Sequence, residues 1–352
     1  MTSVEFEVVK NEIVTMIDTL HLRGVKVTPI YDLLSQVDTL PKMKTWEALY
    51  KFFDEKQYSA IEAELVNQIH SLLKDKTIAH LLFDNKLIKI LEVSENTFDS
   101  LIQFFQSKIT KSITDFNIHQ LIVAKAFKHV KFRYDISNQL ESYISKSIVE
   151  DDLKINIENR VSKKLKKEFK DIYGIKKIKF HTLSHVVFDK RNKVIFLAVD
   201  LAGIIKVTSL QKNMDSLSIS VKGSVKNLTY PNHSRNLFAK IRDFYNNEPY
   251  PAGYVVKLFY KTPDGMTYTS NSNQNFPDAR DSTYHKHGEQ GIQGKLSIYR
   301  ILKGFNTKRH TNFTIELASI PAMTTRPAPV LFDATVKATN QEDFAEALQK
   351  LI

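Results

Sequence analysis

The sequence contains no cysteine among its 352 residues. Disulfides, iron–sulfur clusters, cysteine-ligated zinc and thiol catalysis are therefore excluded. The lack of cysteine also fits a reducing compartment. The first residues, MTSVEFEVVKNE, include early acids and lack the apolar core of a secretory signal. From these two features we expect a cytoplasmic protein.

Long apolar runs are also missing. The most apolar stretch, VIFLAVDLAGII (194–205), is about half the length of a bilayer-spanning helix and contains Asp200. We therefore expect no membrane span.

Several nucleotide and hydrolase motifs are absent as well. The sequence has no G-x-x-x-x-G-K-[ST] loop, no G-x-G-x-x-G after a predicted strand and no G-x-S-x-G elbow. With a single tryptophan and scattered histidines, no cofactor-binding pattern stands out. We predict no cofactor, and the sequence leaves open whether the protein is an enzyme.

Glycine and proline are scarce in the first half of the chain. Before Gly174, the only examples are Gly24, Pro29 and Pro41. Apolar residues recur at helical spacing, and Thr45 precedes one such segment as a plausible N-cap. A further helical segment begins at SENTF (94–98) with a start that resembles a capping box. We predict a helical domain over residues 1–172.

The pattern changes to β-rich runs after Gly174. Most of these runs are short, alternate polar with apolar residues and are separated by turn residues, as in antiparallel strands. They lie at 177–189, 193–200, 203–210, 216–225, 253–262, 265–270, 295–302, 311–320 and 331–338. Helical patterns occur only at 232–247 and near the C-terminus. We predict an α+β fold, in which the helical domain is followed by a mainly antiparallel β domain with two helices over residues 173–352.

Charge is distributed unevenly along the chain. Residues 1–100 carry 11 Lys and Arg against 16 Asp and Glu, whereas residues 101–250 carry 27 against 14. An acidic head on a basic body favours a polyanionic partner for the body. The acidic helical domain would repel phosphates, so we predict that it serves self-association or binding of a protein partner.

The most basic stretch is 160–193, with twelve basic and three acidic residues. Its first part reads as an amphipathic helix whose lysines face water, which is also what any surface helix shows. The charge continues into the predicted hairpin that follows. If the hairpin folds back beside the helix, the two form one patch able to neutralise several phosphates. The cations assigned to this patch are Lys163, Lys164, Lys166, Lys167, Lys170, Lys176, Lys177, Lys190 and Arg191.

A second candidate surface is the segment 298–313, which interleaves rings with cations. Single-stranded nucleic acids are held in this way, with cations along the phosphates and rings stacked on bases. We assign Arg300, Lys303, Phe305, Lys308 and Arg309 to this surface. Strand residues alternate between two faces, so the rings can equally belong to the core. The segment 254–268 shows the same alternation and allows the same two interpretations.

The third candidate is the long polar connection 269–294. Loops of this length in a compact domain are usually functional or disordered. If it is extended, His285, His287 and Glu289 project from one face and become weak candidates for a metal site. No fourth ligand is evident, so we predict no metal.

The charge layout leads to one main hypothesis and two alternatives. We expect a nucleic-acid-binding protein that contacts DNA or RNA without sequence specificity, because lysines position a phosphate backbone rather than read bases. The composition is rich in Asn, Lys and Ile, as in proteins encoded by AT-rich bacterial or phage genomes. We therefore consider a phage or defence protein. The alternatives are a metal-dependent nuclease or phosphodiesterase using the His285/His287 loop, and a structural or assembly protein.

Overall fold

The computed structural model describes residues 3–37, 40–54, 63–109, 111–112, 131–156, 172–201, 214–215, 217, 221, 234–247, 252–275, 277–291 and 296–352. Within these ranges it contains eight α-helices and one ten-stranded antiparallel sheet. The predicted α+β fold, with a helical N-terminal region and a largely antiparallel sheet, is confirmed. Among the described residues, no helix has both the length and the apolar character needed to cross a bilayer.

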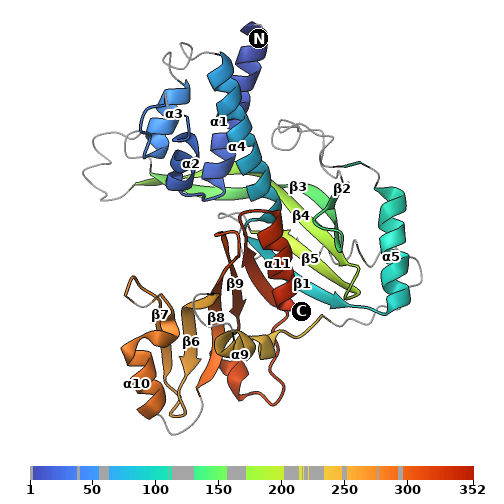
Figure 1. The fold of residues 1–352 in the computed structure, drawn as a ribbon, viewed down its shortest axis with the longest axis vertical. Coiled ribbons are helices and arrows are strands. Elements are labelled where there is room, and N and C mark those ends of the chain that lie inside the picture. Colours follow the sequence, from blue (N-terminus) through green and yellow to red (C-terminus); the bar gives the residue numbers. More distant parts are fainter. Residues whose placement is uncertain are drawn as a thin grey trace.

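Four helices form the N-terminal region: α1 (Ser3–Leu22), α2 (Val27–Leu34), α3 (Trp46–Asp54) and α4 (Ala63–Phe83). The long helices α1 and α4 pack side by side at one end of the molecule (Figure 1). The predicted cap of α3 is present, since the Thr45 hydroxyl accepts a hydrogen bond from the Ala48 amide at 3.1 Å. Fixed at its first turn, α3 packs against α1.

The sheet runs through both halves of the sequence. Its strand order is β2-β3-β4-β5-β1-β10-β9-β8-β6-β7. The bounds are β1 (Lys86–Glu92), β2 (Lys131–Asp135), β3 (Leu140–Asn156), β4 (Tyr173–Asp189), β5 (Val194–Asp200), β6 (Gly253–Lys261), β7 (Thr267–Asn271), β8 (Ser297–Asn306), β9 (Asn312–Ala318) and β10 (Asp333–Lys337).

Three of these strands lie in the range predicted to be all helical, and for β1, β2 and β3 that prediction is wrong. A short apolar run such as KLIKILE in β1 fits a helix or a strand equally well. The neighbouring strands make this run a strand, because β1 pairs with β5 on one side and with β10 on the other. The predicted domain boundary at 172–173 falls between β3 and β4, which pair over their whole length. The division into two domains stays a prediction.

The remaining helices are α5 (Glu95–Lys108), α9 (Phe238–Asn246), α10 (Thr283–Gly291) and α11 (Gln341–Leu351), with short 3-10 helices η4 (Ala279–Asp281) and η5 (Pro321–Thr325). The start of α5 is as predicted, because the Ser94 hydroxyl accepts a hydrogen bond from the Thr97 amide. The helices α9 and α11 match the two predicted in the C-terminal half. The helix α10 lies in the segment predicted to be a loop, and Leu217 and Val221 are helical where a strand was predicted.

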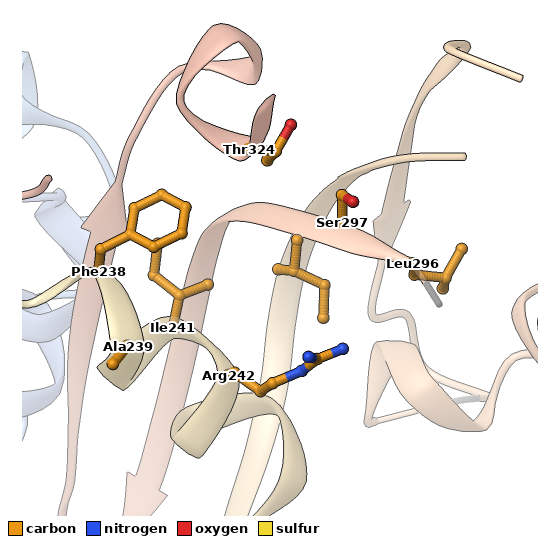
Figure 2. Close-up of a pocket in the computed structure, with 8 residues that line it drawn as sticks. Phe238, Ala239, Ile241, Arg242, Leu296, Ser297 and Thr324 are labelled. Atoms are coloured by element: carbon orange, nitrogen blue, oxygen red, sulfur yellow. The ribbon is translucent and has the colours of Figure 1, made fainter. Parts of the chain in front are cut away.

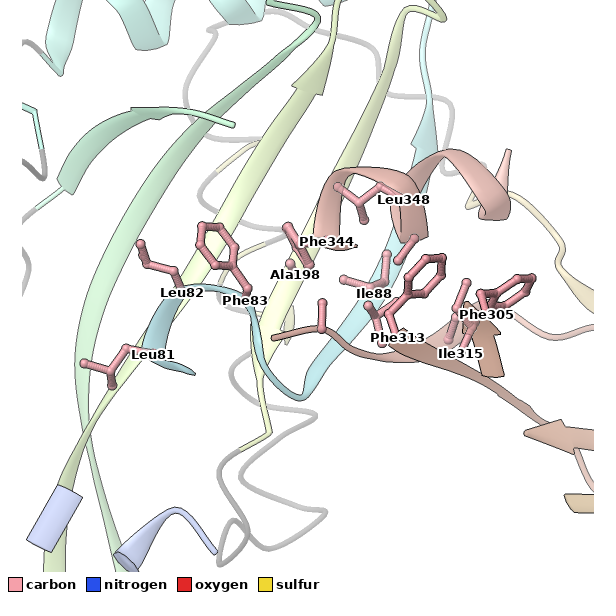
Figure 3. Close-up of a cluster of buried hydrophobic side chains, with 14 of the residues drawn as sticks. Leu81, Leu82, Phe83, Ile88, Ala198, Phe305, Phe313, Ile315, Phe344 and Leu348 are labelled. Atoms are coloured by element: carbon pink, nitrogen blue, oxygen red, sulfur yellow. The ribbon is translucent and has the colours of Figure 1, made fainter. Parts of the chain in front are cut away.

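Two apolar clusters lie on opposite faces of the sheet. The larger one joins α1, α4, α9 and α11 to one face, and Figure 3 shows Phe344 and Leu348 of α11 beside strand residues of that face, including Ile88 and Phe313. The smaller cluster lies beneath α5 on the other face, around Phe98 and Phe188. Burial on both faces explains why every residue of β5 is buried.

A buried ionic cluster ties the end of α1 to the sheet. The Arg23 guanidinium donates two hydrogen bonds, at 2.9 and 2.6 Å, to the two carboxylate oxygens of Asp200. Lys86 Nζ lies 3.3 Å from the same carboxylate and donates to the backbone carbonyls of Leu81 and Leu183. Burial would raise the pKa of Asp200, but Arg23 and Lys86 hold it below its usual value. Burial in turn lowers the pKa of Lys86 to about 8.

This lysine makes stability depend on pH. Below about pH 8, Lys86 is protonated in both the folded and the unfolded chain, so its burial cost is fully present. Above that pH the folded chain releases the proton first, and stability rises with pH. Relative to Lys86→Met, the wild type should gain about 2 kcal/mol of unfolding free energy between about pH 7.5 and about pH 9.5, measured by urea denaturation. A pH-independent difference would contradict the burial of a charged Lys86.

Candidate nucleic-acid interface

The predicted basic surface falls partly outside the described residues. Lys163, Lys164, Lys166, Lys167 and Lys170 lie there, and only the backbone of Lys176 is described, within β4. Lys177 is exposed on β4, and the strand register places it directly opposite Asp152 of β3. The described part of the β3–β4 pair is therefore less basic than the lysine-rich sequence of β4 alone indicates.

The tight turn between β4 and β5 is built by Asp189. Its carboxylate accepts hydrogen bonds from the backbone amides of Arg191 and Asn192, at 2.9 and 3.0 Å. Lys193 then adopts a left-handed backbone conformation with φ of 53°. This geometry leaves the Arg191 side chain exposed.

The neighbouring Lys190 is engaged in an ion pair. Its ammonium lies 2.7 Å from a carboxylate oxygen of Glu141, which is fully buried. Burial would raise the pKa of Glu141, but hydrogen bonds from Lys190, Tyr143 and Gln106 hold it below its usual value. Lys190 therefore has a structural partner, and Arg191 is the cation of this turn that is directed to solvent.

The second predicted surface, 298–313, divides between the core and a turn. Lys303 is fully buried, and its ammonium donates hydrogen bonds to the backbone carbonyls of Phe244 and Asn247 at the end of α9. Phe305 is also buried and stacks on Phe313 with a centroid separation of 5.0 Å. Both residues were assigned to the nucleic-acid surface. The strand alternation instead turns them towards the core, so they are removed from it.

The other three residues of this segment remain on the surface. Lys308 and Arg309 are exposed in the turn between β8 and β9, and Arg309 lies 3.4 Å from Glu342. Arg300 is half exposed on the opposite face of β8 from Lys303, where it forms an ion pair of 2.6 Å with Glu316. The segment thus supplies cations to two separate places rather than one.

Both basic turns pack against α11. At its C-terminal end, Gln349 donates a hydrogen bond of 2.8 Å to Asp189, at the base of the β4–β5 turn. At its N-terminal end, the Thr311 hydroxyl of the β8–β9 turn donates one of 2.7 Å to Asp343. The exposed cations therefore lie at the two ends of one helix, Arg191 at its C-terminal end and Lys308 and Arg309 at its N-terminal end, although more than 100 residues separate the two turns in the sequence.

A cavity of about 480 Å³ lies beside the β8–β9 turn. It is lined by three cations (Lys308, Arg309 and Lys350), three acids (Glu342, Asp343 and Glu346), and Ala252, Phe305, Asn306 and Thr307. Asp343 is not available to a ligand, because Thr311, Thr339 and Asn340 donate hydrogen bonds to its carboxylate. Two of the cations, Lys308 and Arg309, come from the turn, and Lys350 comes from the last turn of α11.

A smaller pocket of about 280 Å³ lies between α9, η5 and the start of β8 (Figure 2). Phe238 and Ile241 of α9 form one wall, and Leu296 and Ser297 lie opposite, with Thr324 from η5 above (Figure 2). Arg242 supplies the one charge among its lining residues. The pocket has no converging set of polar groups that would perform chemistry on a ligand.

The predicted metal candidates do not converge. They lie on α10 rather than on an extended loop, so His285 and His287, two residues apart, point in different directions. His285 is buried and its Nε2 lies 3.0 Å from the Tyr245 hydroxyl, which donates to Glu289 at 3.1 Å. His287 is exposed. Among the described residues, no group of three or more potential ligands could hold a metal ion.

The contacts of His285 instead fasten α10 to its neighbours. Burial lowers the pKa of His285, so the ring is neutral near pH 7. Arg280 joins the same assembly, with its guanidinium bonded to Asp278 and to the Tyr245 carbonyl. These contacts connect α9, η4 and α10, and they have the geometry of a packing site rather than of an open catalytic centre.

Comparison with known proteins adds no assignment. No protein-family profile matches the chain, and no curated protein matches it.

Proposed function

We propose that the protein binds nucleic acid through its phosphate backbone, without sequence specificity. The observation that carries this proposal is the placement of exposed cations at both ends of α11, with Arg191 at one end and Lys308 and Arg309 at the other. Exposed cations at both ends of one helix attract a chain of phosphates that runs along the helix, and binding releases the counterions of that chain. The excess of 27 Lys and Arg over 14 Asp and Glu in residues 101–250 supports the same partner.

The predicted lysines of residues 163–170 belong to this proposal through their place in the sequence. They lie in the connection between Asn156 at the end of β3 and Tyr173 at the start of β4. Cations of this kind contact phosphates and do not discriminate between bases. The proposal therefore concerns DNA or RNA as a polyanion, and binding must weaken steeply as salt is added.

The test is binding of labelled single- and double-stranded DNA and RNA, measured by fluorescence anisotropy at two salt concentrations. We expect the triple variant Arg191→Gln/Lys308→Gln/Arg309→Gln to bind about 10-fold or more weakly at low salt. Its plot of log affinity against log salt should be shallower by up to about 3 units, because each lost phosphate contact removes about 0.9. A second variant, Lys163→Gln/Lys164→Gln/Lys166→Gln/Lys167→Gln, tests the predicted lysines in the same way.

The matched control removes the same charge from another place. Lys26, Lys42 and Lys44 are exposed in the helical region, and Lys26→Gln/Lys42→Gln/Lys44→Gln should bind as the wild type does. Equal losses in the control and in the turn variant would mean that net charge alone is responsible. No binding by the wild type at low salt would overturn the proposal.

A further inference from the structure

The strands β6, β7, β8 and β9 have a second face, opposite to the one that packs on α9 and α11. On β8, Ile301, Lys303 and Phe305 point to the core, whereas Arg300, Leu302 and Gly304 alternate with them on the other side. Directly opposite residues in the strand register share this side. It carries Tyr254, Lys257, Phe259, Thr267, Thr269, Asn271, Arg300, Leu302, Gly304, Thr314 and Glu316, which we call the open sheet face.

The open sheet face is solvated. Its residues on β7 are exposed, and those with side chains on β6, β8 and β9 are half-buried. Two α-helices that contact these strands, α9 and α11, reach them from the core side through Phe244 and Phe344, and the short helices η4 and η5 contact β6, β7 and β8. An antiparallel sheet with one packed and one wet face usually presents polar residues to water. Here two aromatic rings and a leucine lie among them.

Phe259 occupies the middle of this face, between two cations. The Lys257 ammonium lies 4.9 Å from the centroid of its ring, and the Arg300 guanidinium carbon lies 4.7 Å from it. Arg300 also forms an ion pair with Glu316 on the next strand. Both cations have long, flexible side chains. Their charged ends can therefore move off the ring and contact a phosphate next to it.

Tyr254 lies at the other end of the same face, across Gly304. A Cβ atom added at Gly304 would meet the Tyr254 ring at 2.4 Å, so the glycine provides the space in which the ring lies flat against β8. In the register, Gly304, Leu302 and Arg300 stand opposite Tyr254, Lys257 and Phe259 in turn. The two rings therefore lie on either side of Leu302, with polar residues of β7 and β9 around them.

We propose that the open sheet face is a base-stacking site for single-stranded nucleic acid. Unpaired bases would stack on Phe259 and Tyr254, while Lys257 and Arg300 contact the phosphates between them. The bases of a duplex are stacked on one another and cannot reach a flat protein surface, so this face selects single strands. The inference rests on the proposed function and specifies its substrate class.

The test is binding of a single-stranded oligonucleotide that contains 2-aminopurine, whose fluorescence changes when the base stacks. Phe259→Leu keeps an apolar side chain on the strand but removes the ring. We expect it to bind the single strand about 5- to 100-fold more weakly, with the fluorescence change reduced. Duplex binding and its salt dependence should stay as in the wild type, because the phosphate contacts around α11 are intact. Tyr254→Leu should give the same pattern.

The matched control is Phe332→Leu, which removes a ring that is 39% exposed outside this face and should leave binding unchanged. Thermal denaturation of each variant establishes that it is folded. Wild-type affinity of both ring variants for single strands would overturn the stacking site, while a loss in the triple variant around α11 would still support phosphate binding. Absence of binding to any nucleic acid by the wild type would overturn both.

Discussion

Replacing Asp200 with asparagine is expected to lower the free energy of unfolding by about 3–5 kcal/mol. Asp200 is fully buried and is the shared partner of Arg23 and Lys86, which are themselves buried. Asparagine has nearly the same size, so the change removes the charge and little else. Two cations would then remain in the interior without their counter-charge, at the point where α1 meets β5. Urea denaturation at neutral pH measures the effect.

The appropriate control for Asp200→Asn is an ion pair on the surface. Asp99 of α5 lies 2.8 Å from Lys193, and both side chains are more than a third exposed. Asp99→Asn should change the free energy of unfolding by less than about 1 kcal/mol, because water screens this pair. Similar effects of the two substitutions would mean that water reaches the Arg23–Asp200–Lys86 cluster in solution.

Replacing Phe305 with alanine should destabilise the fold by a similar amount, about 3–5 kcal/mol. The ring is fully enclosed, stacks on Phe313 and contacts Phe244 edge-on at 5.6 Å. Its removal leaves a cavity between the sheet and α9 that these neighbours cannot fill. Well below the unfolding temperature, however, the variant should bind nucleic acid as the wild type does, because the ring is only 2% exposed and the exposed cations Arg191, Lys308 and Arg309 are unchanged.

This second result separates a core residue from a binding residue. If folded Phe305→Ala lost affinity for nucleic acid with little loss of stability, Phe305 would be a binding residue, as its sequence pattern predicts. Phe332, which is 39% exposed, provides the comparison, since Phe332→Ala should lower the free energy of unfolding by only about 1–2 kcal/mol. Thermal and urea denaturation give the stability term, and anisotropy gives the affinity.

The difference between Phe305 and Phe259 illustrates what strand alternation leaves open. Both rings lie on strands in which aromatic, apolar and basic residues alternate, and the pattern predicts two faces without telling which one is packed. The helices decide this, because α9 and α11 cover the side of Lys303 and Phe305. The burial of Lys303 cannot be predicted from residue spacing. It depends on where α9 ends, because the carbonyls at the end of that helix accept the hydrogen bonds of the buried ammonium.

The sequence by itself determined the fold class, the helical start of the chain and several helix ends. Those features depend on local rules: the periodicity of apolar residues, and caps such as Thr45 and Ser94 that satisfy free backbone amides. It also determined the uneven charge, which is a property of composition. These features can be predicted without knowing which segments of the chain contact each other in the folded protein.

The tertiary structure alone decided the position of β1 and the grouping of charges. The short run 86–92 became a central strand because β5 and β10 offered pairing on both sides. Arg191 and Lys308 came to opposite ends of one helix because α11 crosses the sheet from the β8–β9 turn at one end of the strands to the β4–β5 turn at the other. Long-range pairing carries no local signal, which is why α10, the open sheet face and the buried Arg23–Asp200–Lys86 cluster could not be predicted from the sequence.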